Sequence, residues 1–339
     1  MNTTQVAVDL AKSVFEVAVS RRPGKVCESH RLSRSRFEKF FALREPVEVL
    51  MEACGTAHHW GRTLEAMGHR VRLLPPSDVS RYRDGNKTDR ADAKALLEAA
   101  RNEKIDPVPV KSVDQQAIAA LHRIRSGYQQ TRTARINAVR GHLREFGIMI
   151  PLGASRVLPL ARAALQTDTV PAYLCDVLEE VLHEIETLSE KEAVQRRLEQ
   201  LSKQMPDAQT LMTIPGIGVL TATALVSFVG DVHRFRSGRQ LAAYLGLTPR
   251  EFSSGNKRRL GRITKRGNTY VRMLLIHGAR SALQAGKRSD EPDDLRTWAL
   301  DVERRRGHNV ATVALANKLA RVAWRVWRDQ RPFEQRRPA

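Results

Sequence analysis

The pattern of apolar and polar positions divides the chain into a strand-and-helix region followed by a region of helices alone. Short β-branched or apolar runs in the first hundred residues predict strands at 5–9, 14–19, 47–52 and 70–74, and residues 26–32 could form a further strand after the second. Helical spacing at 35–43 and 58–67 separates the last three runs, and Pro75 and Pro76 end the final one. The first three runs predict an antiparallel meander. The resulting order, βββαβαβ, predicts a ribonuclease-H-like α/β domain.

From residue 88 onward the pattern predicts no strand, and helices at 89–102, 113–146, 171–204 and 308–328. Segment 171–204 would extend about 50 Å if it were fully helical. Its apolar positions recur at spacings of four and three over barely two heptads, at Leu174, Leu178, Val181, Ile185 and Leu188. Such a stripe fits an arm that packs on its own chain as well as an arm that pairs with a second copy. Trp324 and Trp327, three positions apart in the last helix, indicate packing rather than base stacking.

These boundaries predict an α/β plus α protein in three parts. Residues 1–110 form the ribonuclease-H-like domain, 111–205 a basic helix and coiled-coil arm, and 206–339 a mainly helical C-terminal domain. The 339 residues carry a formal net charge of +20, and half of it lies between residues 206 and 290. A chain this basic usually has a polyanion as its partner, because each Lys or Arg on a phosphate releases a condensed counterion.

Cysteine usage and hydropathy exclude several classes of protein. Cys27, Cys54 and Cys175 are odd in number and lack CxxC spacing, which supports neither a disulfide framework nor a zinc site. No signal peptide opens the chain, and no apolar run approaches about 18 residues. We therefore expect a cytoplasmic bacterial protein with no membrane partner, associated with the nucleoid when it acts.

Four carboxylates occupy positions that predict a metal site. Asp9 and Glu52 end two predicted strands, and Asp89 and Asp92 lie three apart on one helix face. Converging carboxylates repel one another and raise one another's pKa unless a cation lies between them. Oxygen-only ligands favour Mg²⁺, with Mn²⁺ as a substitute, and two such ions can hold a scissile phosphate. Taken singly, Asp9 could be a turn former and Asp89 a helix cap with Asp92 in the first turn.

Glycines and arginines elsewhere indicate contact with nucleic acid. Residues 214–218, IPGIG, predict a helix-hairpin-helix in which Gly216 and Gly218 let backbone amides approach a phosphate. A plain tight turn between two packed helices is the alternative. The predicted helix 113–146 carries arginines with little acidic compensation, which favours phosphate contact: Arg125, Arg132, Arg135, Arg140 and Arg144.

A serine pair precedes a strongly basic loop. Ser253 and Ser254 are followed by seven basic residues and no acidic one: Lys257, Arg258, Arg259, Arg262, Lys265, Arg266 and Arg272. Cations placed there would stabilise a serine alkoxide and the charge of a pentacovalent transition state. A serine in a polar loop is more often only a turn residue, so the spacing alone does not establish a nucleophile.

Together these motifs make the chain resemble the DEDD transposases of bacterial insertion sequences. The resemblance is to the IS110 family with its IS1111 branch, and to the related Piv pilin-gene invertase, over essentially the whole chain. The segments that carry it are 8–9, 51–55, 87–92, 214–218 and 253–268.

The resemblance implies a RuvC-like N-terminal domain in which Asp9, Glu52, Asp89 and Asp92 bind magnesium. It further implies a coiled-coil insertion and a C-terminal transposase domain. Ser254 is the implied nucleophile, forming a transient phosphoserine link to DNA, and Ser253 is the adjacent alternative. Donor and target DNA, an element-encoded structured guide RNA and a homo-oligomer, either dimer or tetramer, are the implied partners.

Two other functions remain open from the sequence. In a RuvC-like junction nuclease, metal would activate water and Ser254 would be a bystander. In a non-catalytic architectural protein that binds DNA or RNA, neither Asp9 nor magnesium would matter. A covalent protein–DNA adduct distinguishes recombination from hydrolysis, because hydrolysis by water leaves no adduct.

Overall fold

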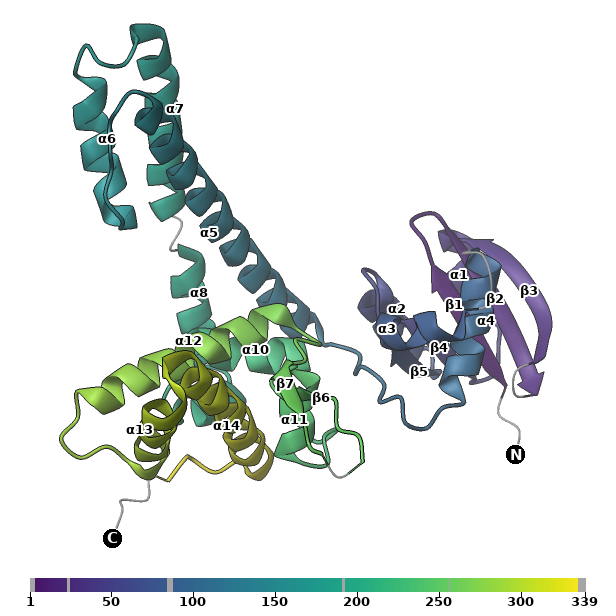
Figure 1. Ribbon diagram of the computed structural model, residues 1–339. Helices are drawn as coiled ribbons and strands as arrows, with labels where there is room; N and C mark the ends of the chain where they lie inside the picture. The colour runs from purple at the N-terminus through teal and green to yellow at the C-terminus, as the bar shows by residue number, and fades with distance from the viewer. Residues whose placement is uncertain (1–3, 23–24, 84–87, 191–192, 256, 335–339) are drawn as a thin grey trace. The chain divides into compact units, whose positions relative to one another are not determined.

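The computed structural model describes residues 4–22, 25–83, 88–190, 193–255 and 257–334, and leaves out the side chains of residues 89, 90, 190 and 193. The chain forms two compact units, Met1–Gln116 and Ala117–Ala339. Figure 1 shows the first unit in purple to blue and the second in teal to yellow.

The N-terminal unit is built on a five-stranded mixed sheet. Its strands are β1 (Gln5–Leu10), β2 (Val14–Arg22), β3 (Lys25–Ser33), β4 (Glu48–Glu52) and β5 (Arg70–Leu74), in the order β3-β2-β1-β4-β5. The strands β1, β2 and β3 form the predicted antiparallel meander, while β1 pairs with β4, and β4 with β5, in parallel. The predicted order βββαβαβ is confirmed, and the mixed sheet is consistent with a ribonuclease-H-like fold.

Helices cover both faces of this sheet. Helices α1 (Arg34–Ala42) and α2 (Ala57–Ala66) pack on the face that carries Val8, Phe15 and Met51. Helix α4 (Asp89–Ala100) packs on the opposite face, against residues such as Ala7 and Leu50. Because successive side chains of a strand alternate between faces, burial on both sides requires the near-continuous apolar runs of β1, β2 and β4. Short helices α3 (Pro76–Val79) and η1 (Ser80–Tyr82) lead toward α4.

A helical arm opens the C-terminal unit. Figure 1 shows α5 (Val113–Glu145) running to the tip of the arm, where α6 (Val157–Leu165) and α7 (Ala172–Glu190) lie beside its last turns. The short turn η2 (Ala154–Arg156) precedes α6, and α8 (Ala193–Ser202) follows α7. The predicted apolar stripe packs on its own chain, since Leu178 and Ile185 are buried in one cluster with residues of α5 and α6. Within the described residues, this favours the self-packed interpretation of the stripe.

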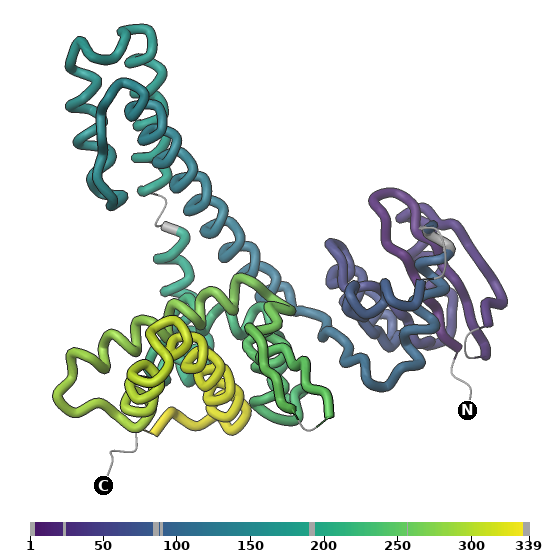
Figure 2. Tube along the Cα trace, viewed as in Figure 1, coloured from purple at the N-terminus to yellow at the C-terminus, as the bar shows by residue number. Residues whose placement is uncertain are grey.

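The rest of the unit is a helical bundle with one small hairpin. Its helices are α9 (Pro206–Met212), α10 (Val219–Val229), α11 (Gly238–Tyr244), α12 (Thr269–Lys287), α13 (Asp294–Arg306) and α14 (His308–Asp329). Trp324 and Trp327 are buried, which confirms that they pack. The prediction of no strand after residue 88 is wrong: β6 (Pro249–Glu251) and β7 (Leu260–Ile263) form an antiparallel hairpin, which Figure 2 traces at the edge of the bundle.

A buried histidine joins the base of the arm to the bundle. The ring of His122 on α5 lies 3.1 Å from the Tyr270 hydroxyl on α12 and 3.0 Å from the Thr223 hydroxyl on α10. Because Thr223 donates its own proton to the Val219 carbonyl, Nε2–H must donate to Thr223, and Nδ1 accepts from Tyr270. Burial lowers the pKa of His122 to about 4, so the ring is neutral at pH 7.

Candidate functional site

The register of the sheet brings two of the predicted metal ligands together. Val8 of β1 lies opposite Met51 of β4 in the parallel ladder, so the next step of the register places Asp9 beside Glu52. Asp9 shares the face of Ala7, and Glu52 shares the face of Leu50, so both carboxylates leave the sheet on the side covered by α4. The prediction that each of these carboxylates lies at the end of a strand is confirmed, and the register makes the two strands neighbours.

The pKa of Cys54 is a second sign that Asp9 and Glu52 lie close together. Burial raises the pKa of its thiol, and the charges of Glu52 and Asp9 raise that pKa further. Both carboxylates therefore act on one half-buried group just beyond the end of β4.

Helix α4 brings Asp92 to this face of the sheet. Asp92 is buried, and its Oδ1 accepts a charge-assisted hydrogen bond from Nε of Arg83. The cap of the helix is Thr88, whose hydroxyl accepts from the Ala91 amide, so Asp89 is the first helical residue and not the cap. The side chain of Asp89 lies outside the described residues. Sequence reasoning missed Arg83, because nothing in the spacing of residues 83 and 92 indicates their ion pair.

The donor set fits a hard cation in its chemistry. Among the described side chains, no three histidine, cysteine or carboxylate groups form a cluster that could hold a metal ion. The described candidates Asp9, Glu52 and Asp92 nevertheless share one side of the sheet and offer only oxygen, as Mg²⁺ and Mn²⁺ prefer. The guanidinium of Arg83 supplies the positive charge that the buried Asp92 carboxylate needs.

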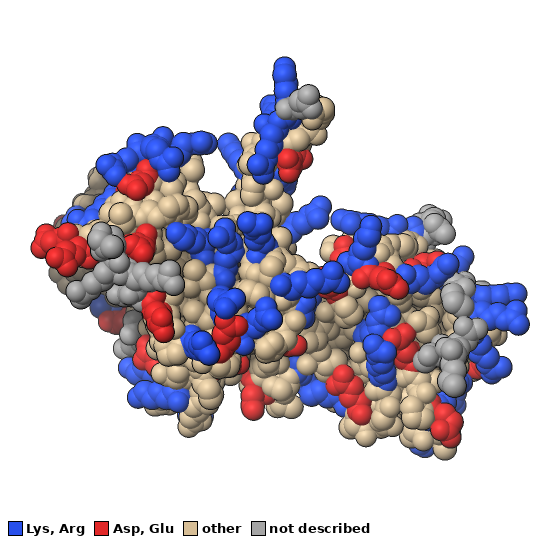
Figure 3. Space-filling view, turned by 90° about the horizontal axis from the view of Figure 1, so that it is seen from below, with Lys and Arg blue, Asp and Glu red and all other residues tan. Residues whose placement is uncertain are grey.

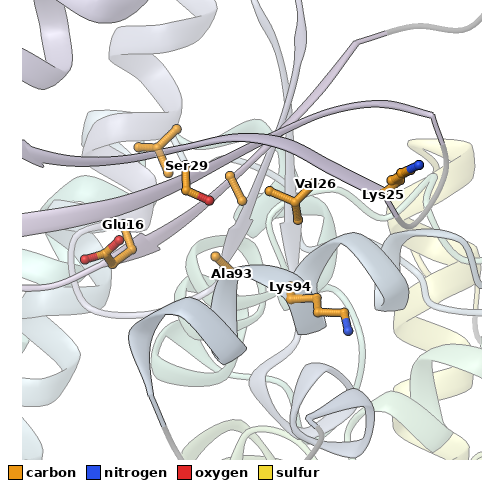
Figure 4. Close-up of a pocket in the computed structure, with 8 residues that line it drawn as sticks. Glu16, Lys25, Val26, Ser29, Ala93 and Lys94 are labelled. Carbon is orange, nitrogen blue, oxygen red and sulfur yellow. The ribbon is translucent and has the colours of Figure 1, made fainter.

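A fourth described carboxylate borders the same side. Glu16 of β2 lies opposite Asp9 in the antiparallel register, and it pairs with Arg31 at 3.5 Å. Beside it, between the β2–β3 hairpin and α4, is a hollow of about 240 Å³ that Figure 4 shows with Glu16, Ser29 and Lys94 among its lining residues. The polar position within the apolar run 14–19 is the sequence signal that could have singled out Glu16.

The two serines of the hairpin β6–β7 have different environments. The Ser253 hydroxyl donates to Oε1 of Glu251 at 2.7 Å and accepts from the Arg259 amide at 3.1 Å. Ser254 is exposed, and its hydroxyl has no hydrogen-bond partner among the described residues. Its backbone is fixed by two hydrogen bonds with Lys257, and the following Gly255 adopts the left-handed φ of 55° that a tight turn needs. The hairpin holds Ser253 in place and leaves the Ser254 hydroxyl accessible.

The basic loop is exposed to solvent, and its end packs against the backbone of α11. Its exposed cations are Lys257, Arg258, Arg259, Arg262, Lys265 and Arg266, of which Arg258 lies 3.7 Å from Glu251. Gly267 has a φ of 69°, and a Cβ there would lie 2.0 Å from the Tyr244 carbonyl oxygen, so the loop depends on glycine to pack against the end of α11. The face of the molecule in Figure 3 shows many Lys and Arg side chains with smaller groups of Asp and Glu between them.

Arg272 corrects the prediction that all seven basic residues contact nucleic acid. Its guanidinium is buried and donates to the carbonyl oxygens of Leu245, at 3.0 Å, and Arg266, at 2.7 Å. Burial lowers the pKa of Arg272. Arg272 therefore ties the basic loop to α11 from inside, because carbonyl groups and not phosphates satisfy its donors.

The two glycines of the predicted helix-hairpin-helix have different surroundings. Gly216 has a φ of 89°, and a Cβ there would lie 2.7 Å from the Gly278 carbonyl oxygen on α12, so this glycine permits close packing. Gly218 is exposed at the start of α10, which has no side-chain cap. A hollow of about 740 Å³ lies beside both, lined in part by His277 and Arg296. Phosphate contact at this turn stays a prediction.

The arginines of α5 also divide by environment. Arg135 pairs with Glu184 of α7 at 2.7 Å, and Arg140 donates to the carbonyl oxygens of Pro151 and Gly153. Arg125 donates hydrogen bonds to the side chains of Gln129 and Gln195. Arg125 and Arg132 both line a hollow of about 140 Å³. Arg144 is exposed. At least Arg135 and Arg140 hold the arm together, and their phosphate contacts stay predictions.

Carboxylates at the ends of neighbouring strands of a mixed sheet, in a chain that continues into a strongly basic helical unit, are typical of enzymes that act on the nucleic-acid backbone. Two transposase models match the chain: the DEDD transposase model of IS110 at residues 6–148, and the transposase IS116/IS110/IS902 family at residues 208–292.

Relatives that match almost the whole chain are also transposases. A probable family 20 transposase of Pseudomonas aeruginosa is 41% identical over 96% of both chains. The transposase for insertion sequence element IS1111A of Coxiella burnetii is 40% identical over 97% of this chain and 90% of the relative. The transposase for insertion sequence element IS1328 of Yersinia enterocolitica is 35% identical over 95% of this chain and 96% of the relative.

The chain belongs to the IS116/IS110/IS902 family of transposases, and it is a DNA transposase of the recombinase class. The resemblance drawn from the motifs is confirmed at the level of the family, and the Coxiella relative supports the IS1111 branch. DEDD transposases are in general metal-dependent and act on DNA. No helix within the described residues has the length and apolar character needed to cross a membrane.

Proposed function

We propose that this transposase cleaves and rejoins DNA through a covalent phosphoserine link formed by Ser254. In this proposal Asp9, Glu52, Asp89 and Asp92 hold a divalent cation, Mg²⁺ or in its place Mn²⁺. The observation that carries the proposal is the contrast within the serine pair. The Ser253 hydroxyl is engaged by Glu251 and the Arg259 amide, whereas the exposed Ser254 hydroxyl has no partner among the described residues.

The chemistry balances without an outside energy source. The Ser254 oxygen attacks a backbone phosphorus, one P–O bond of the DNA breaks, and the serine proton ends on the DNA hydroxyl that leaves. A hydroxyl of the exchanged strand then attacks the phosphoserine, and the serine oxygen leaves with a proton. A bound divalent cation would neutralise phosphate charge and polarise the phosphorus–oxygen bonds.

The residues of the chain would share the remaining tasks. The carboxylates would orient the scissile phosphate through the cation, while cations of the basic loop such as Lys257 and Arg259 stabilise charge on the transition state. Lys265, which adopts a left-handed φ of 57°, and Arg266 are further candidates for this role. Because the bond energy of the phosphodiester is kept in the serine ester, rejoining would need no cofactor besides the metal.

Guide RNA and oligomer formation belong to the same proposal. The formal charge of +20 supports a large polyanionic partner, and an element-encoded RNA would carry the choice of sequence. The tip of the arm supports contact between copies, because it exposes large apolar side chains: Met149, Leu152, Leu160, Tyr173 and Val177. Sequencing RNA that co-purifies with the protein tests the first point, and light scattering of the protein with and without nucleic acid tests the second.

Trapping of the covalent intermediate tests the nucleophile. The protein is incubated with Mg²⁺ and an end-labelled duplex that spans a junction of the insertion element and carries a nick that prevents rejoining. We expect a labelled protein band on a denaturing gel, absent with Ser254→Ala and present with the matched control Ser253→Ala. Peptide mass spectrometry is expected to place the nucleotide on residue 254.

Two results would contradict the proposal. An adduct at the wild-type level with Ser254→Ala would remove this serine from the reaction. Metal-dependent cleavage with no adduct in any variant would indicate hydrolysis by water.

A further inference from the structure

The hairpin β6–β7 has two chemically different faces. On one face Ser253 bonds to Glu251, two residues before it, as side chains on one side of an extended strand do. Arg258, near the same Glu251, and Leu260, its partner in the register, also belong to this face. We call it the bracing face, because its groups satisfy one another.

The opposite face carries Phe252 and Ser254. These residues alternate with Glu251 and Ser253 along the segment that continues β6 toward the turn. Each is hydrogen-bonded to the facing segment before β7, Phe252 to the Arg259 carbonyl and Ser254 to the Lys257 backbone. Residues opposite one another in an antiparallel pair share a face. The presenting face, as we define it, therefore holds Phe252 and Ser254 together with Lys257 and Arg259.

Phe252 is exposed by 62% although it is a large aromatic residue, and its ring lies over Gly261. A Cβ at residue 261 would lie only 2.9 Å from Cε2 of Phe252 and 3.8 Å from Cβ of Arg250. Because Gly261 has no side chain, one side of the Phe252 ring can pack against its backbone. The rest of the ring surface remains open to solvent between basic residues.

We propose that Phe252 is a stacking platform for the nucleobase next to the phosphate that Ser254 attacks. Base stacking on an exposed aromatic ring, with flanking cations on the backbone phosphates, is the usual means of holding a single strand. Phe252 and Ser254 are two residues apart in the segment that follows β6, which corresponds to about 7 Å at the rise of an extended chain. A base held on the ring would fix the adjoining phosphate relative to the serine hydroxyl. The inference rests on the proposed role of Ser254.

Charge complementarity identifies nucleic acid as the occupant of this face. Arg250, Lys257 and Arg259 are exposed, and no acidic residue pairs with them among the described residues. An apolar protein partner would have to bury these cations, at a cost in desolvation. A single strand of DNA or RNA would satisfy the cations and the ring at once.

Four substitutions and one control distinguish base stacking from other effects. Phe252→Ala removes the ring, Phe252→Leu keeps an apolar side chain without it, and Phe252→Trp keeps an aromatic surface. Gly261→Ala keeps Phe252 but displaces its ring from the backbone of residue 261, at a residue whose φ tolerates alanine. Leu260→Ala, on the bracing face, removes an exposed apolar side chain and is the matched control.

The first measurement is adduct yield on the nicked duplex at limiting DNA. We expect Phe252→Ala and Phe252→Leu to lower the yield about 5- to 100-fold, Gly261→Ala to fall between them and wild type, and Phe252→Trp and Leu260→Ala to stay within about 3-fold. Equal loss in Leu260→Ala and Phe252→Ala, or no loss in Phe252→Ala, would overturn the platform. An adduct that forms normally with Ser254→Ala would overturn the proposed function instead.

The second measurement needs no cleavage. In the Ser254→Ala background, single-stranded DNA and RNA oligonucleotides of the junction sequence, with 2-aminopurine at successive positions, report stacking by their fluorescence. We expect quenching at one position that Phe252→Ala removes, with no change in the salt dependence of binding, because no phosphate contact is lost. Quenching confined to the RNA oligonucleotide would contradict the proposal, because the phosphate that Ser254 is proposed to attack belongs to DNA. Identical fluorescence profiles with and without Phe252 would contradict the proposal.

Discussion

The two units of this transposase place their chemical groups in opposite ways. In the N-terminal unit Asp9 and Glu52 end neighbouring buried strands, so the register of the sheet determines where they lie. In the C-terminal unit Ser254 belongs to a hairpin with strands of three and four residues, and its surroundings are almost entirely exposed. These arrangements suit the proposed roles, because carboxylates that share a cation need a rigid frame and a serine that attacks a long substrate needs access.

The stability of the two arrangements differs for the same reason. Moving Asp9 relative to Glu52 would require a slip of a sheet whose two faces are buried, which is costly. The hairpin depends on a few local bonds: the Ser253 brace, the Lys257 ladder and the packing of Gly267 on α11. Substitutions in the first region should therefore act through chemistry, and those in the second through the position of the loop.

The largest effect is expected from Asp9→Asn. It keeps the size of the side chain but removes a charge that the proposed metal site needs, so strand cleavage should fall on the order of 10³-fold. Removal of the metal with EDTA should lower cleavage to a similar extent. Glu16→Gln is the matched control on the neighbouring strand, because Glu16 pairs with Arg31 and should change cleavage by less than about 5-fold. Cleavage rates on the nicked duplex at saturating Mg²⁺ measure both. Equal losses would mean that the sheet face, and not a defined ligand set, matters.

A glycine at the base of the serine loop should have the next largest effect. Gly267→Ala combines a left-handed φ with a Cβ 2.0 Å from the Tyr244 carbonyl oxygen, and should lower the free energy of unfolding by about 3–5 kcal/mol. Gly255→Ala is the control, because its φ is also left-handed but no atom lies within 4 Å of the added Cβ, and about 1 kcal/mol is expected. Urea unfolding monitored by hydrogen exchange of α11 and α12 measures both. Equal losses of stability in the two variants would show that the loop does not pack against α11.

The two units should also differ in their response to acid, because His122 belongs to the C-terminal unit alone. Its pKa is about 4 in the folded protein and 6.5 in the unfolded chain. The unfolded chain therefore binds more protons between these values, so stability is complete above pH 6.5 and falls as the pH drops toward 4. The loss should reach about 3 kcal/mol, since one pKa unit corresponds to about 1.4 kcal/mol.

Hydrogen exchange of α10 and α12 between pH 7 and 4.5 measures this loss. The substitution His122→Gln should flatten the pH dependence while lowering stability at pH 7, because the bonds to Tyr270 and Thr223 are disturbed. His277→Gln, on the exposed side of α12, is the control. If His122→Gln kept the full pH dependence, another group would have to be responsible.

The sequence predicts the N-terminal unit better than the hairpin for a physical reason. Strands buried on both faces need near-continuous apolar runs, and β1, β2 and β4 have them, whereas the edge strand β3 has no buried residue. Strands β6 and β7 are exposed, so neither apolar alternation nor length distinguishes the residues 249–251 and 260–263 from a loop. The predicted helix 171–204 is helical over Ala172–Glu190 and Ala193–Ser202, on either side of the two residues outside the described part of the chain.

The candidate site was predictable only where local pattern determines position. Asp9 and Glu52 could be placed from the ends of apolar runs, and Asp92 from its helical spacing. Arg83 and Arg272 could not, because their roles depend on partners that only the fold brings near, the Asp92 carboxylate and the Leu245 and Arg266 carbonyls. Charge along the sequence does not distinguish a cation that meets a phosphate from one that is used internally.

The smallest effect is expected from Ser253, whose hydroxyl braces the hairpin beside the proposed nucleophile Ser254. Ser253→Ala removes two hydrogen bonds of an exposed hairpin, to Glu251 and from the Arg259 amide, and should cost about 1 kcal/mol or less in stability. Adduct formation should persist but slow by about 3- to 10-fold, because Ser254 keeps its backbone bonds to Lys257 and loses only the support of the opposite face. Ser253→Thr retains the hydroxyl and should recover most of the rate, as measured by single-turnover adduct formation. If Ser253→Ala abolished the adduct while Ser254→Ala did not, the nucleophile would be Ser253, and the contrast between a braced and an accessible serine would be reversed.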